Sequence, residues 1–167
     1  MLPAVTLAAR IDAMADAAFP AARRGYELDA PSAVWTADVA DLAGDGDAAI
    51  ADRADADWLA LTRADAAVLD RVRVPSAYAC SGAAAGRGTL HGEWLGIYEL
   101  ATLPEARRRG AATAIVGALA ARGAARGARH AYLMVEEGNA PAHALYARLG
   151  IRRAYGYSYR VREPGDR

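Results

Sequence analysis

Apolar positions along the chain recur first with helical and then with strand spacing, and they predict a series of short elements. An alanine-rich helix is predicted over 7–24, and SAVWTADVA over 32–40 reads as a strand that follows a turn at RGYELDAP. The small, acidic segment GDGDAAIADRADA over 44–56 has no apolar period and is predicted as a linker.

A denser apolar pattern begins after this segment. RADAAVLDRVRVP over 63–75 predicts one short helix that ends at Pro75. SAYACSG and GRGTLHG are typical of two short strands, and EWLGIYELAT over 93–102 of a longer one. Pro104 ends that strand, and a helix is predicted to begin within EARRRG.

The last third of the chain alternates strand and helix. HAYLMVEE over 130–137 is almost uniformly apolar, which is typical of a strand buried on both faces. A helix follows over 140–149, and AYGYSYRVR then places Tyr155, Tyr157, Tyr159 and Val161 on one half-buried face. This order predicts the α/β class with a mixed sheet flanked by helices.

Composition narrows the classes of function. With 167 residues the chain fits one domain of ordinary size, and its formal net charge of +0 favours neither nucleic acid nor an anionic membrane as a partner. All basic residues are arginine, which excludes a catalytic lysine. Cys80 is the single cysteine, no metal-ligand spacing occurs, and neither a signal peptide nor a membrane span is recognisable, so a cytoplasmic location is expected.

The segment LPEARRRGAATAIV over 103–116 carries the first candidate chemistry. The start of a helix exposes unpaired N–H groups that can bind an anion. Gly110, Ala111 and Ala112 keep bulky side chains away from that backbone, and the preceding arginines can close over a charged group. This combination favours a loop that holds a phosphate over a plain solvated charge run.

Two motifs give the chain a resemblance to a known family. Residues 107–112, Arg-Arg-Arg-Gly-Ala-Ala, resemble the R-x-x-G-x-A/G pattern with which GCN5-related N-acetyltransferases (GNAT) bind the pyrophosphate of acetyl-coenzyme A. AYLMVEEGNAPAHALYARLGI over 131–151 resembles the next motif of that family. The resemblance covers residues 57–163 and implies a GNAT fold, with a twisted mixed sheet that is splayed at the cofactor cleft.

The resemblance also implies roles for particular residues. Acetyl-coenzyme A is the expected co-substrate, with no metal, and an amine is the expected acceptor. Tyr146 matches the tyrosine that protonates the departing thiolate, and Asn139 matches an asparagine that contacts the cofactor or caps the helix. The other expected cofactor contacts are Leu100, Ala101, Thr102, Arg107, Arg108, Arg109, Gly110, Ala111, Ala112 and Thr113.

The general base is less well defined by the sequence. Glu99 is the first candidate, although strict alternation puts it on the face opposite Leu100 and Thr102 unless a bulge intervenes. Glu93, Glu136 and His91 are alternatives, and a water relay is another. Cys80 is interpreted as a packed thiol, and His130 has no informative spacing.

The chain departs from the family pattern in two places. Only one short helix is recognisable on the acceptor side, where the family usually has two. The second departure is an internal similarity: AARRGYELDAPSAVWTAD over 21–38 resembles YARLGIRRAYGYSYRVRE over 146–163. This similarity leads to the hypothesis that residues 1–43 are the remnant of a degenerate first GNAT half. The linker at 44–56, the main domain at 57–163 and a tail at 164–167 would follow. This hypothesis requires strand 32–40 to pair within the sheet.

Two functions follow from the resemblance. The first is an N-acetyltransferase that acts on a primary amine of a small molecule or peptide by direct attack in a ternary complex. The second is a non-catalytic module of the same fold that binds acyl-coenzyme A as a sensor or structural part. Tyr146 favours the enzyme, and the short acceptor side favours the module. The resemblance also admits a homodimer, but no sequence feature locates an interface.

Overall fold

The computed structural model describes residues 27–44 and 47–161, and the predicted helix over 7–24 lies outside them. The helices and strands in chain order are β1 (Glu27–Asp38), α2 (Val39–Leu42), β2 (Ala49–Ala51), α3 (Ala56–Thr62), α4 (Ala66–Leu69), β3 (Ser76–Cys80), β4 (Ala84–His91), β5 (Trp94–Thr102), the 3-10 turn η2 (Pro104–Ala106), α5 (Ala111–Ala124), β6 (His130–Glu136), α6 (Ala140–Arg148) and β7 (Arg152–Val161).

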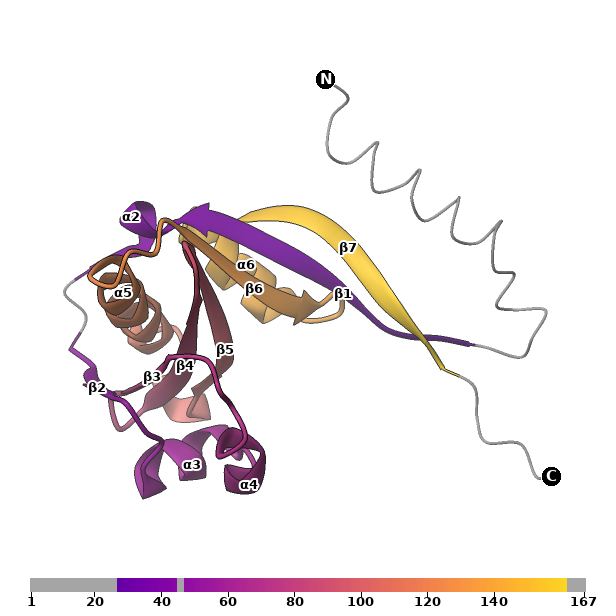
Figure 1. The fold of residues 1–167 in the computed structure, drawn as a ribbon. Coiled ribbons are helices and arrows are strands. Elements are labelled where there is room, and N and C mark those ends of the chain that lie inside the picture. The colour runs from indigo at the N-terminus through magenta and orange to yellow at the C-terminus, as the bar shows by residue number, and fades with distance from the viewer. Residues whose placement is uncertain (1–26, 45–46, 162–167) are drawn as a thin grey trace.

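Seven strands form one mixed sheet in the order β2-β3-β4-β5-β6-β1-β7 (Figure 1). Only β5 and β6 run parallel, and the other neighbouring pairs are antiparallel. The predicted α/β class and mixed sheet are therefore confirmed. The strand predicted over 32–40 pairs with both β6 and β7, as the hypothesis of a degenerate first half requires.

The two faces of the sheet are covered by different helices. Helix α5 buries Ile115, Val116 and Leu119 against Leu95 and other apolar residues of one face. On the opposite face, Trp58 of α3 packs in a separate cluster with residues of α4, β3 and β4. The Trp58 indole N–H also donates to the carbonyl of Gly86 at 3.0 Å, which ties α3 to β4.

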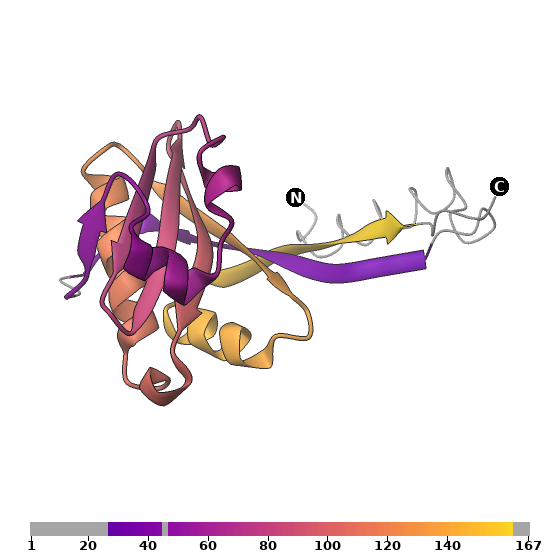
Figure 2. The same cartoon turned by 90° about the horizontal axis from the view of Figure 1, so that it is seen from below.

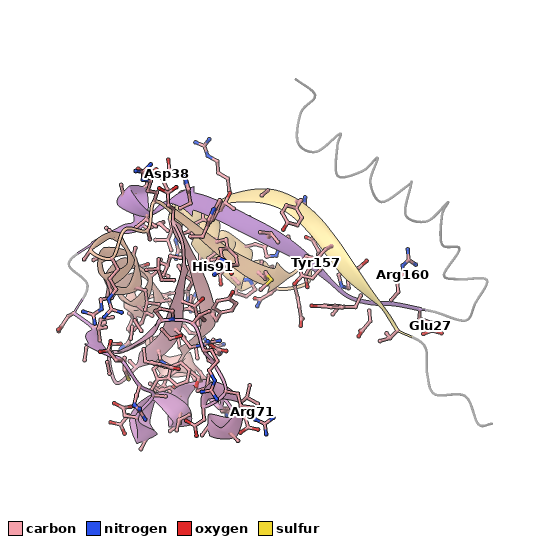
Figure 3. The ribbon with its side chains drawn as sticks, in the orientation of Figure 1. Glu27, Asp38, Arg71, His91, Tyr157 and Arg160 are labelled. Atoms are coloured by element: carbon pink, nitrogen blue, oxygen red, sulfur yellow. The ribbon has the colours of Figure 1, made fainter. Side chains whose placement is uncertain are left out.

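Strands β1 and β7 extend beyond the rest of the sheet as a two-stranded ribbon (Figures 1 and 2). Strand β6 pairs with β1 only from Ser32 to Asp38, whereas residues 27–29 of β1 pair with β7 alone. Glu27 and Arg160 lie near the tip of the ribbon, and Asp38 lies at its other end (Figure 3). Tyr155, Tyr159 and Val161 are each about half exposed, so these three side chains lie outside the buried core.

Several predicted boundaries also need correction. Of the predicted turn at RGYELDAP, residues 27–31 belong to β1 and the first three lie outside the described residues. Ala30 adopts a positive φ of 44° there, at a register shift between Asp29 and Ser32. The predicted linker at 44–56 contains β2, which pairs with β3. β6 is not buried on both faces, since Met134 is 45% exposed.

Two short helices, α3 and α4, lie between β2 and β3, where the sequence indicated one. The Asp55 carboxylate caps α3 by accepting from the Trp58 N–H at 2.8 Å. Arg63 ends this helix with a left-handed φ of 57°, and Asp65 caps the next one. The chain therefore has the two helices that the family pattern usually includes at this place, and the expected departure from that pattern is absent from the described residues.

Candidate functional site

Strands β5 and β6 separate partway along their length. They pair from Trp94 and His130 to Ile97 and Leu133, and no pairing between them follows. Strand β5 continues along β4 to Thr102, whereas β6 continues along β1 to Glu136. The splay that the family resemblance implied is present, and it opens a V between the carboxyl ends of the two strands.

A bulge lies in β5 beside this opening. The register with β4 shifts between the Ala85 and Arg87 positions, and Glu99 adopts a positive φ of 47°. A Cβ added at Gly86 would meet side-chain atoms of both Leu100 and Ile115, so Leu100 faces the α5 side. Tyr98 lies by alternation on the other face, which is the face covered by α3, and the bulge turns Glu99 to that same face.

Glu99 forms a two-pronged ion pair with Arg87 of β4. The Arg87 Nε donates to Glu99 Oε2 at 2.7 Å, and Nη2 donates to Oε1 at 2.9 Å. The guanidinium also lies over the Tyr98 ring, 5.0 Å from its centroid. Burial lowers the pKa of Arg87, but the hydrogen bonds and charge of Glu99 outweigh this effect and raise it.

A second polar contact closes the base of the V. The hydroxyls of Tyr98 on β5 and Tyr132 on β6 are 2.5 Å apart and share a hydrogen bond. Burial, followed by this bond, raises the pKa of Tyr132 to about 12. Gly96 makes room for both rings, because a Cβ there would come within 2.6 Å of Tyr98 and 2.9 Å of Tyr132.

Sequence reasoning did not single out Arg87, Tyr98 or Tyr132. The alternation of Trp94, Gly96 and Tyr98 in EWLGIYELAT was a usable signal, because it places one small residue between two aromatic residues on one strand face. Arg87 could be assigned only once the register of β4 and β5 was known.

The loop after β5 leads to the start of α5. The segment predicted to begin the helix forms the turn η2 instead, and α5 itself begins at Ala111. Gly110 caps it with a φ of 86°, and the first backward helical bond runs from the Ala114 N–H to the Gly110 carbonyl at 2.9 Å. The N–H groups of Ala111, Ala112 and Thr113 therefore point out of the helix end, as an anion site requires.

The exposed loop residues differ in what they contribute. Arg107, Arg108 and Arg109 are all exposed, and Arg108 has a φ of 60°. A Cβ on Gly110 would meet nothing within 4 Å, so steric clearance from the protein is not the reason for this glycine. A glycine is favoured at position 110 because of its positive φ, since residues with a Cβ adopt that backbone conformation only at a cost in free energy.

Helix α6 carries the remaining predicted residues. The Asn139 side chain caps the helix by accepting from the Ala142 N–H at 3.2 Å, which is one of its two expected roles. Tyr146 is buried, with 7% of its surface exposed, and its hydroxyl makes no hydrogen bond to another described residue. Burial raises the pKa of this phenol.

The alternative bases are placed differently. His91 and Glu93 flank the β4–β5 turn, at the end of β5 that is remote from the bulge. Glu93 pairs with Arg129 at 3.2 Å. Glu136 lies at the end of β6 beside the V, where its backbone carbonyl accepts a hydrogen bond from His143 Nε2 at 3.0 Å.

Two side chains outside the V carry no assigned role. His130 contacts Asp38 at 3.0 Å. Cys80 is partly buried at the end of β3 and packs against the cluster around Trp58.

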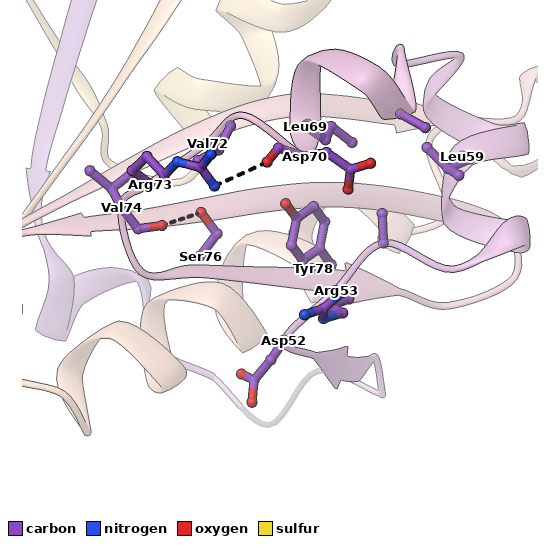
Figure 4. A pocket seen from close by; sticks show the side chains of 12 residues that line it. Asp52, Arg53, Leu59, Leu69, Asp70, Val72, Arg73, Val74, Ser76 and Tyr78 are labelled. Carbon is purple, nitrogen blue, oxygen red and sulfur yellow. Dashed lines mark hydrogen bonds between the residues drawn. The ribbon is translucent and has the colours of Figure 1, made fainter.

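A cavity of about 350 Å³ lies beside α4 and β3, away from the V (Figure 4). Leu59, Leu69 and Tyr78 form its apolar wall, and Asp70 and Arg73 lie at its rim. Across residues 27–44 and 47–161, no three His, Cys, Asp or Glu side chains gather in a way that would hold a metal ion. None of the helices in these ranges has the length and apolar composition needed to cross a bilayer.

Comparisons with known proteins agree with this arrangement. The family model described as "Probable histone acetyltransferase Rv0428c C-terminal" matches residues 12–160. A GCN5-related N-acetyltransferase from Kribbella flavida superposes with a TM-score of 0.64 at 16% identity, over 90% of this chain and 65% of that one. No curated protein sequence matches the chain.

Two further solved structures resemble the chain. A GCN5-related N-acetyltransferase from Sphaerobacter thermophilus has a TM-score of 0.58 at 17% identity, over 91% of this chain and 58% of that one. A GNAT-family protein from Novosphingobium aromaticivorans has a TM-score of 0.56 at 20% identity, over 79% and 64%. At these identities the likeness shows the fold, and the chain spans less than two thirds of each structure.

Proposed function

Because the chain belongs to the GCN5-related N-acetyltransferase family, we propose that it transfers an acetyl group from acetyl-coenzyme A to a primary amine of a small molecule or peptide. The observation that carries this proposal is the splayed V. It opens between β5 and β6 after Ile97 and Leu133, with Glu99 at one wall. The amine would attack the thioester directly in a ternary complex.

The start of α5 would hold the pyrophosphate of the cofactor. The outward N–H groups at the helix end and the positive φ of Gly110 support this assignment. Arg107 would add its guanidinium, whereas Arg108 and Arg109 would act chiefly through their backbone. The pantetheine arm would then run along Leu100, Ala101 and Thr102, and Asn139 would act mainly by capping α6.

Tyr146 would donate its proton to the coenzyme A thiolate as it leaves. The phenol is protonated at neutral pH, and burial raises its pKa further, so the proton is available across the physiological range. Its hydroxyl has no protein partner among the described residues, which leaves it available to the thiolate.

Glu99 would remove the proton from the attacking ammonium, directly or through water. Each Glu99 carboxylate oxygen accepts one hydrogen bond from Arg87, which fixes the orientation of the carboxylate. The bulge directs it to the face covered by α3, opposite the face on which α5 packs. Amine and cofactor would thus approach the V from opposite faces of the sheet.

The alternative function is a module that binds acyl-coenzyme A without turnover. Release of free coenzyme A from acetyl-coenzyme A, measured across a panel of small amines and amine-bearing peptides, separates the two functions. The enzyme releases coenzyme A only when a suitable amine is present. Tight binding of acetyl-coenzyme A without turnover on any amine would establish the non-catalytic module instead.

A further inference from the structure

The N-terminal strand supplies an aromatic side chain to helix α6. Trp35 of β1 is 9% exposed, and its ring lies 5.2 Å from that of His143 and 6.2 Å from that of Tyr146, centroid to centroid. His143 and Tyr146 are three residues apart on α6 and therefore share a face of that helix. A residue far from both in sequence thus packs directly against the proposed acid.

The two α6 side chains are held in different ways. The His143 Nε2–H donates to the Glu136 carbonyl at 3.0 Å, which fixes the imidazole to the end of β6. The Tyr146 hydroxyl has no hydrogen-bond partner among the described residues, so packing alone orients its ring. Trp35 is the aromatic residue that provides this packing from outside the helix.

The indole N–H of Trp35 is itself unpaired. It is buried and makes no hydrogen bond to any residue in the described ranges. A buried donor without a partner lowers stability, so hydrogen bonding does not explain a tryptophan at this position. The breadth of the ring, which reaches both His143 and Tyr146, does explain it.

We propose that Trp35 is a positioning residue that holds the phenol of Tyr146 against the cofactor cleft. This proposal rests on the proposed function, because it assumes that Tyr146 is the acid. It means that the site is completed by a strand outside residues 57–163, the range that the sequence motifs cover. The strand does so from its place between β6 and β7.

The test compares Trp35→Leu with Trp35→Phe in the full chain. Trp35→Leu removes the aromatic contact and should lower kcat by about tenfold to a hundredfold through misplacement of the phenol. The KM for acetyl-coenzyme A should change by no more than about threefold, since the proposed pyrophosphate site is built from the start of α5 and not from Trp35. Trp35→Phe keeps an aromatic ring and loses no hydrogen bond, so it should restore most of kcat.

Trp58→Leu is the control for loss of a buried aromatic ring, and it also removes the hydrogen bond from the Trp58 indole N–H to the Gly86 carbonyl. Trp58 is also buried, at 1% exposure, but it packs against Tyr78 in the other cluster, on the opposite face of the sheet. A general loss of stability should occur in both leucine variants, whereas an effect on Tyr146 should occur only in Trp35→Leu. The proposal is overturned if Trp35→Leu keeps the kcat of the parent, or if a smaller folded fraction accounts for the whole loss of kcat.

A readout that needs no turnover separates this proposal from the proposed function. The Tyr146 ring carbon signal, labelled with ¹³C and assigned through Tyr146→Phe, reports the pKa of the phenol. Burial raises that pKa. Trp35→Leu should lower the pKa toward 10, and Trp58→Leu should leave it unchanged. An unchanged pKa in Trp35→Leu would contradict positioning even if the chain proved to be a non-catalytic module.

Discussion

At the residue scale, the phenol of Tyr146 is the group whose chemistry can be isolated most cleanly. Tyr146→Phe removes one oxygen that makes no hydrogen bond to the described residues, so the fold should be retained. Turnover should fall by about a hundredfold or more, the usual contribution of a general acid. Binding of acetyl-coenzyme A, measured by calorimetry, should be nearly unchanged, and an unaltered kcat would remove the assigned role.

Gly110 offers a second test at this scale, because its positive φ can be separated from steric clearance. Gly110→Val places its Cβ in open space, with no atom within 4 Å, but must adopt a φ near 86°, at a cost of about 1–2 kcal/mol. The loop should relax and weaken acetyl-coenzyme A binding by about tenfold. Gly127→Val is the control, since Gly127 has a φ of 94° and open space beyond the other end of α5. Equal losses of affinity in both variants would contradict the assigned pyrophosphate site.

At the element scale, the Arg87–Glu99 pair joins β4 to the bulge in β5. Glu99→Gln leaves the guanidinium, which is 10% exposed, without its counter-charge and should destabilise the fold by about 3 kcal/mol. The double variant Arg87→Met with Glu99→Leu should recover most of this loss, because it leaves no buried charge. Urea unfolding measures both effects. If the double variant were as unstable as the single one, the unpaired buried charge would not be the cause of the loss.

The hydroxyl pair between β5 and β6 makes alkaline stability depend on Tyr98. A tyrosine pKa raised by folding stabilises the protein below the unfolded value near 10, and this contribution is lost as pH rises through the folded value. For Tyr132 the folded value is about 12, so the loss falls between pH 10 and 12. Tyr98→Phe removes one cause of the raised pKa and should flatten the stability profile in this interval. Unfolding midpoints at several alkaline pH values test this, and parallel profiles would refute it.

At the scale of the whole molecule, the sequence motifs predicted the elements β5, α5 and α6 better than they predicted how the strands are ordered in the sheet. The apolar periods of EWLGIYELAT, the α5 segment and the Asn139 motif located β5, α5 and α6 because each element there carries its own local pattern. The short helix α3 was missed, since seven residues bounded by Asp55 and Arg63 show too few turns to reveal a period.

The placement of β1 required more than local pattern. Its alternation predicted a strand, but the choice of neighbours depends on contacts between residues more than 90 positions apart, such as Trp35 with Leu133 and Arg153. Arg87, Tyr98 and Tyr132 escaped detection for the same reason, because their contacts follow from strand register. Residues of the candidate site can therefore be predicted from the sequence where one continuous segment contains them. They cannot be predicted where strand pairing brings distant segments together.

The interior position of β1, between β6 and β7, makes the fold depend on this strand. Strand β7 has β1 as its partner in the sheet, so loss of β1 would also detach β7. Val34→Pro removes a backbone N–H from a strand paired on both sides and should lower the free energy of unfolding by about 3 kcal/mol or more. Ala56→Pro is the control, because it places proline at the first position of α3, where the missing N–H costs little.

Urea unfolding followed by both tryptophan fluorescence and far-UV circular dichroism would show whether the loss is shared by the whole sheet. If β1 is integral, Val34→Pro should shift one cooperative transition to lower urea in both signals. If β1 were an appendage, the transition of the α5 and α3 clusters would stay in place. Because Trp35 lies on β1 and Trp58 on α3, an appendage would also separate the two fluorescence changes.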